Sequence, residues 1–209
     1  PGGTAAVINT LADAGTSSAR AFSGLLQRIG LTDGPEKTDG LKPEERLVIA
    51  LCQAFSVFAQ ESSWDDQASR TRCADALKRL LTLPRAPASI QAAAIASLGA
   101  FPRQVTATGL QLLMQGLSSS EVQRAGVLSL ARLGESRPAH EFFSQLTDYS
   151  PMDCFNYARV WGLAGNTSRA GVWLTKAMML GFNRIHLVRN TRELDAACRS
   201  SRVRVLFDL

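Results

Sequence analysis

The sequence predicts an all-α fold, a right-handed α-solenoid built from stacked antiparallel helix pairs. Two ten-residue segments, beginning at Ser89 and Glu121, read as copies of one helical unit 32 residues apart. Internal similarity at a fixed offset is typical of helical repeats. Apolar residues also recur at spacings of three and four, and aromatic residues make up only 7% of the chain, which favours helix over strand.

The pattern divides the chain into four parts. Residues 1–30 form an N-terminal helical segment, in which Phe22, Leu25 and Ile29 lie on one side of an amphipathic helix. Residues 31–41 contain two glycines and a proline, so we expect a flexible loop that proteases cut first. Helical repeats follow over 42–150, and a helical hairpin with a C-terminal capping helix completes the chain over 151–209.

Two helices are predicted before the first repeat copy. Pro43 begins a helix that ends near 60–63, since proline is favoured in the first turn. Ser63 caps the next helix, which the prolines of segment 83–87 stop. Within it, segment 77–81 fits the L-x-x-L-L pattern of a groove-binding helix, but we favour a buried face.

Segment 88–134 carries the two copies. The first helix, 88–99, ends at Gly99, and a partner helix runs over 105–116; the second copy ends at Leu133 and Gly134, before a helix over 137–147. This segment resembles HEAT-type repeats. The matching residues are Ile90, Ala93, Ile95, Leu98 and Gly99, then Val122, Ala125, Val127, Leu130 and Gly134.

Segment 151–182 opens at Pro151 and turns at Gly165 and Asn166. It resembles one tetratricopeptide repeat, with Phe182 where proline is usual. The matching residues are Ala158, Trp161, Gly165, Ala170, Leu174 and Ala177. The following residues are similar to the ending of such arrays, in which a last short helix covers the apolar face; Asn190 with Glu193 predicts a capping-box start for that helix. Both resemblances imply protein interaction and supply no catalytic residue.

No catalytic, cofactor-binding or metal-binding site is predicted. The two histidines, His140 and His186, lie in no motif with zinc-ligand spacing, and a nucleophilic pair of Cys154 with His140 lacks any sign of an oxyanion hole. The four cysteines are expected to be buried, although a Cys52–Cys73 disulfide stays open. We therefore expect a non-catalytic protein–protein interaction scaffold that belongs to a larger assembly or chain.

Positive charge gathers at the C-terminal end. Residues 151–209 carry nine Lys and Arg against four Asp and Glu, which accounts for the whole net charge of +5. The basic patch consists of Arg184, Arg189, Arg192, Arg199, Arg202 and Arg204. A solvated face is one interpretation of this patch and a site for an acidic partner is another. The alternative function is therefore binding of nucleic acid or another anionic surface through this end.

The expected protein-binding face lies on the first helix of the tetratricopeptide-like hairpin. Met152, Phe155, Asn156 and Arg159 are predicted to point away from the Ala158 side, with Arg159 making a two-pronged contact to an acidic or extended peptide. No apolar run reaches the length of a membrane span. The compartment is not encoded in a recognisable signal; the cytoplasm is the default expectation, and an extracytoplasmic location stays open.

Overall fold

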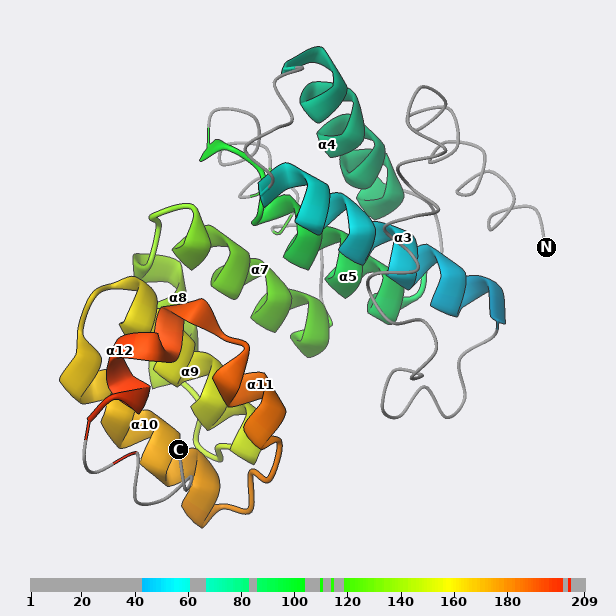
Figure 1. Ribbon diagram of the computed structural model, residues 1–209. Coiled ribbons are helices and arrows are strands. Elements are labelled where there is room, and N and C mark those ends of the chain that lie inside the picture. Colours follow the sequence, from blue (N-terminus) through cyan, green and yellow to red (C-terminus); the bar gives the residue numbers. More distant parts are fainter. Residues whose placement is uncertain are drawn as a thin grey trace. The chain divides into compact units, whose positions relative to one another are not determined.

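A computed structural model describes residues 43–60, 67–82, 86–103, 110, 114, 119–200 and 203. Within these residues all regular structure is helical, which confirms the all-α prediction (Figure 1). The elements are α3 (Pro43–Gln60), α4 (Gln67–Thr82), α5 (Ala88–Leu98), α7 (Ser120–Arg132), α8 (Arg137–Ser144), α9 (Pro151–Leu163), α10 (Thr167–Met179), α11 (Ile185–Arg189), η1 (Arg192–Leu194) and α12 (Asp195–Cys198). The predicted segments 1–30 and 31–41, the Ser63 cap and most of helix 105–116 lie outside the described residues.

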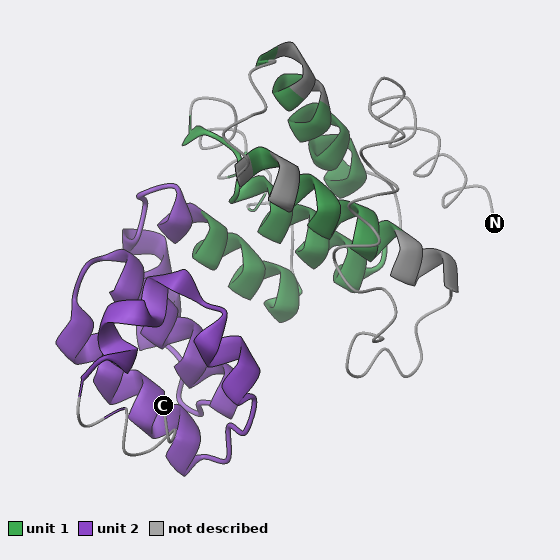
Figure 2. Cartoon of the chain, in the orientation of Figure 1, with its two compact units in different colours: residues 1–129 green, residues 130–209 purple. Residues whose placement is uncertain are grey.

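The chain forms two compact units, residues 1–129 and residues 130–209 (Figure 2). The boundary falls inside α7, whereas the sequence pattern places a change of unit type after residue 150. The second unit begins earlier because α8 packs against α9, with Phe143 stacked on Tyr157 at 4.9 Å between ring centroids. Helix α8 therefore belongs with the C-terminal hairpin.

In the first unit, α3 and α4 both pack against α5. Leu77, Leu80 and Leu81 of α4 are buried, so the L-x-x-L-L segment is a core face, as we favoured. Cys52 and Cys73 are buried free thiols, and so no disulfide joins them. Burial raises the pKa of Cys52 to about 12, which leaves this thiol unreactive.

Two buried serines repeat one contact at the 32-residue offset. Ser97 Oγ of α5 donates to the carbonyl oxygen of Cys52 in α3 at 2.6 Å, and Ser129 Oγ of α7 donates to the carbonyl oxygen of Ile95 in α5 at 2.9 Å. Gly99 permits the second contact, because a Cβ atom there would lie 2.7 Å from Ser129 Cβ. Each copy is thus tied by a hydroxyl group to a helix that precedes it in the chain.

In the second unit, α9 and α10 pack closely along each other. Helix α9 begins at Pro151 and the turn falls at Gly165 and Asn166, as the sequence predicts. The structure adds the caps: Ser150 and Asp153 form a capping box at the start of α9, and Asn166 caps α10. Gly165 and Gly181 end the two helical segments at φ values of 73° and 94°, a region that favours glycine. Ala158, Ala170, Leu174 and Ala177 are fully buried between the helices.

The residues after Phe182 complete the core of this unit. Phe182 stacks on Phe155 with ring centroids 4.6 Å apart, and the buried side chains of α11, η1, α12 and residue 203 join the same cluster. They are Val188, Leu194, Ala197 and Val203. The predicted capping box of Asn190 with Glu193 is wrong: Asn190 ends α11, Thr191 precedes η1 without a side-chain cap, and Glu193 points to α9.

Candidate functional site

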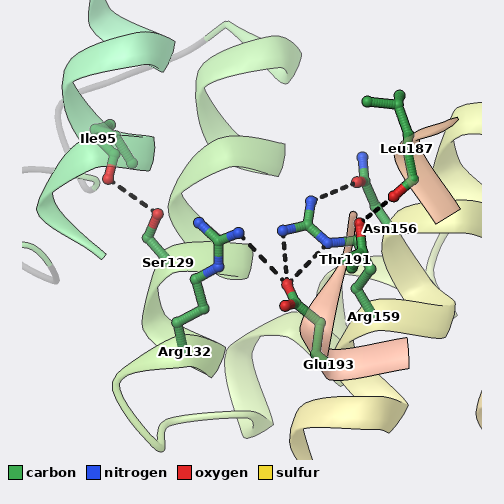
Figure 3. A network of polar contacts seen from close by, with 8 residues as sticks. All are labelled: Ile95, Ser129, Arg132, Asn156, Arg159, Leu187, Thr191 and Glu193. Carbon is green, nitrogen blue, oxygen red and sulfur yellow. Dashed lines mark hydrogen bonds and ion pairs between the residues drawn. The ribbon is translucent and has the colours of Figure 1, made fainter. Parts of the chain in front are cut away.

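A largely buried ion pair links η1 to α9. Arg159 donates to Glu193 Oε1 through Nη2 at 2.7 Å and through Nε at 3.0 Å (Figure 3). Arg132, in the last turn of α7, reaches the same oxygen at 3.4 Å, and Asn156 Oδ1 accepts from Arg159 Nη1 at 3.5 Å. The side chains of Arg159 and Glu193 are each 14% exposed, so little water competes for these contacts.

The two arginines set the ionisation of Glu193. Burial by itself would raise the pKa of this carboxyl, but the charge and hydrogen bonds of Arg159, with a smaller contribution from Arg132, hold the pKa below its usual value. The carboxylate is therefore charged at neutral pH. Gly162 allows this arrangement, because a Cβ atom at that position would collide with the backbone carbonyl oxygen of Glu193.

The four predicted partner-binding residues all make contacts within the second unit. The expected orientation of Phe155 is wrong, since its ring is only 3% exposed and lies in the same cluster as Ala158. Met152 packs against that cluster as well. The two-pronged contact expected of Arg159 exists, but Glu193 of this chain receives it. The half-buried Asn156 orients Arg159. Segment 185–198 contributes side chains that pack against Phe155 and Arg159, so it covers part of the predicted face.

The basic patch is described in part. Arg189, Arg192 and Arg199 are exposed, and Arg184 is half-buried. Arg202 and Arg204 lie outside the described residues. Glu193, although next to Arg192 in sequence, turns inward, so it does not neutralise the arginines that face solvent. The exposed arginine side chains of this patch are therefore a candidate binding site for an anionic partner.

A second candidate surface was not predicted. Both tyrosines of the chain and two of its three tryptophans gather with His140 and two cations across α8, α9, α10 and the loop before α9. We call this the aromatic–cation cluster: His140, Tyr149, Tyr157, Trp161, Trp173, Arg169 and Lys176. Its rings form a continuous path, with centroid distances of 4.2 Å for His140–Trp161, 5.8 Å for Trp161–Tyr157, 4.6 Å for Tyr157–Trp173 and 4.9 Å for Trp173–Tyr149.

The cations of the cluster lie on its rings. Arg169 Cζ is 4.4 Å from the ring centroid of Trp161, and Lys176 Nζ is 4.3 Å from that of Tyr149 and 4.7 Å from that of Trp173. Both side chains are exposed, whereas Trp161, Trp173 and Tyr149 are half-buried. Tryptophan, tyrosine and arginine are the residues that most often dominate the binding energy of protein interfaces, so the cluster has the chemistry of an interface.

The environments of Cys154 and His140 do not suit nucleophilic catalysis. Cys154 is buried in the apolar core, and burial raises the pKa of its thiol, with Lys176 opposing. His140 packs against Trp161. Burial lowers the pKa of His140, and the positive charge of Arg169 lowers it further.

In the described residues no three His, Cys, Asp or Glu side chains are grouped as metal ligands. No helix in that part of the chain is both long and apolar enough to cross a membrane.

Sequence reasoning missed the cluster because its members are spread over residues 140–176 and its tryptophans, Trp161 and Trp173, fit core positions. A sequence signal did exist: Arg169, Trp173 and Lys176 are spaced by four and three and so share one helix face.

No protein-family model, curated protein or solved structure matches this chain.

Proposed function

We propose that the chain is a non-catalytic scaffold of helical repeats, a module of a larger assembly, and that it binds a protein partner through the aromatic–cation cluster. The observation that carries the proposal is the pairing of half-buried tryptophan and tyrosine rings with two exposed cations on one surface. Such a surface combines large contact area with side chains already ordered before binding, which lowers the entropic cost of association.

The repeat character of the scaffold has separate support. Ser97 and Ser129, at equivalent positions of the two copies, each bind a backbone carbonyl of an earlier helix. The small residues expected of a tetratricopeptide-like hairpin, among them Ala158 and Ala170, are buried between α9 and α10. In proteins of both types, stacked helix pairs present side chains to partners. These contacts support the HEAT-like and tetratricopeptide-like interpretations.

A site-specific photo-cross-linker tests the proposal. A benzoylphenylalanine residue at Val172, which is 50% exposed on α10, should form a protein adduct in the native host. The matched control carries the same residue at Gln53, an exposed position of α3, and should give no such adduct. Protease-sensitive adducts at Val172 that are absent at Gln53 support the proposal. Equal labelling at both positions would refute it.

The exposed side chains of Arg189, Arg192 and Arg199 support a second candidate, the binding of nucleic acid or another anionic surface at the C-terminal end. Such binding releases counterions and weakens steeply as salt concentration rises. Titration of the full chain with a labelled single-stranded oligonucleotide at increasing salt measures this slope. Affinity that falls with salt, and falls further in an Arg189→Gln/Arg192→Gln variant, favours this candidate over the protein scaffold.

A further inference from the structure

One face of α10 combines exposed apolar and basic side chains. At 100° per residue, Arg169, Val172, Lys176, Met179 and Leu180 share an arc of roughly 100°, opposite the buried Ala170, Leu174 and Ala177. We call these five residues the α10 face. It continues the aromatic–cation cluster through Arg169 and Lys176.

The α10 face is unusually apolar for an exposed surface. Four large apolar side chains are exposed in the described part of the chain, and three of them belong to this face: Val172 at 50%, Met179 at 82% and Leu180 at 45%. Val172 and Met179 are seven residues apart, the repeat at which the knobs of one helix meet the holes of a second. An exposed apolar stripe of this kind is typical of an interaction site.

The charges of the α10 face indicate which kind of partner helix would fit it. Arg169 lies at the N-terminal end of the face and Lys176 between its apolar residues, and α10 contains no Asp or Glu. Within the described residues neither cation forms an ion pair, and both rest on aromatic rings. A partner helix that places carboxylates beside its apolar stripe would complement both the shape and the charge of this face.

The same charges argue against an occupant from this chain. The N-terminal helical segment expected at 1–30 carries Arg20 and Arg28 against a single acidic residue, Asp13, so it would bring mainly like charge to this face. A two-fold dimer through this face would set Arg169 and Lys176 of one copy against the same residues of the other. The occupant that fits is therefore an acidic helix from a different protein.

We propose that the α10 face binds an acidic amphipathic helix of a partner protein, with the partner's apolar stripe on Val172 and Met179 and its carboxylates on Arg169 and Lys176. This inference rests on the proposed scaffold function and names the partner of that same surface.

The probe is a fluorescein-labelled synthetic helix of three heptads with leucine at positions a and d and glutamate beside them. Two matched peptides replace glutamate by lysine or add two central prolines. Fluorescence anisotropy with the full chain at physiological salt should show saturable binding of the acidic helix alone. Equal binding of the proline peptide, which cannot form the helix, would overturn the inference.

Substitutions on the α10 face test whether the acidic peptide binds there. Arg169→Glu/Lys176→Glu should weaken binding of the acidic peptide at least about tenfold, and Val172→Ser/Met179→Ser should do so to a similar degree. Arg169→Gln/Lys176→Gln offers a milder version of the first change, and circular dichroism checks that each variant folds. The charge-matched control, Arg189→Glu/Arg192→Glu, should bind the acidic peptide with an affinity within about twofold of the parent chain. Loss of affinity in that control alone would show that the peptide binds at the basic patch instead.

Two results separate this inference from the scaffold function. A protein adduct at Val172 without binding of the acidic peptide would overturn the acidic-helix partner and leave the scaffold function standing. Absence of both would overturn both. Self-association of the chain that Lys176→Glu abolishes would overturn the inference in favour of a second copy of the chain.

Discussion

The backbone carbonyl of Glu193 rests against Gly162, in the space that a Cβ atom would fill. The contact brings η1 close enough to α9 for the Glu193 side chain to meet Arg159, which is one helical turn before Gly162. A glycine inside a helix thus positions a charge that comes from another part of the chain.

Gly162→Ala should destabilise the second unit by roughly 1–3 kcal/mol, because the new methyl group would push a backbone carbonyl rather than a flexible side chain. Gly171→Ala is the matched control: it is also a helical glycine, and its Cβ would meet Val203 Cγ2 at an ordinary 3.5 Å. There the better helix propensity of alanine should add up to about 1 kcal/mol. Denaturant unfolding of the full chain measures both, and equal stability of the two variants would contradict the close contact.

The Arg159–Glu193 pair should show strong energetic coupling. Arg159→Met or Glu193→Leu alone leaves a poorly solvated charge and should cost about 3 kcal/mol, whereas the double variant should recover part of that loss. The pair Arg137–Glu141 is the control, since its N–O distance is also 2.7 Å but its side chains are 88% and 57% exposed. A double-mutant cycle there should give little coupling. Comparable coupling in the two pairs would mean that burial does not strengthen the contact.

Acid should remove the contribution of Glu193. Because its pKa is lower in the folded chain than the usual 4.5, the ion pair stabilises the fold above that value and this contribution is lost as pH falls through the folded pKa. Arg159 and Arg132 are the basic groups that face this carboxyl. The stability difference between the parent and Glu193→Gln should therefore be constant from pH 7 to pH 5 and shrink below it. A constant difference down to strongly acidic pH would contradict the lowered pKa.

Ser97→Ala and Ser129→Ala should each lower the free energy of unfolding by about 1 kcal/mol, because each removes a buried hydrogen bond between helices. Ser56→Ala is the control, since the Ser56 hydroxyl bonds only to Gln53 within its own helix. Thermal melting of the full chain compares the three. If Ser56→Ala lowered the melting temperature as much as the other two, the interhelical bonds would add nothing to stability.

Local signals in the sequence predicted most of the described helices. Prolines marked starts such as Pro43 and Pro151, glycines marked ends such as Gly99 and Gly165, and the apolar period identified buried residues such as Leu77 and Leu174. These features act over one or two turns of one helix, so they can be recognised in the sequence without knowing which other helices pack nearby. The 32-residue copy also predicted that Ser97 and Ser129 occupy equivalent positions.

What the sequence by itself determined is therefore most of the described helices, several of their ends and many of their buried residues. Only the tertiary structure decided that Arg159 is held by Glu193, 34 residues away, rather than offered to a partner. It also decided that rings from His140 to Trp173 meet under the cations of α10. The physical reason is range: caps and helical periods are fixed by neighbours within about four residues, whereas these contacts depend on how separate helices pack.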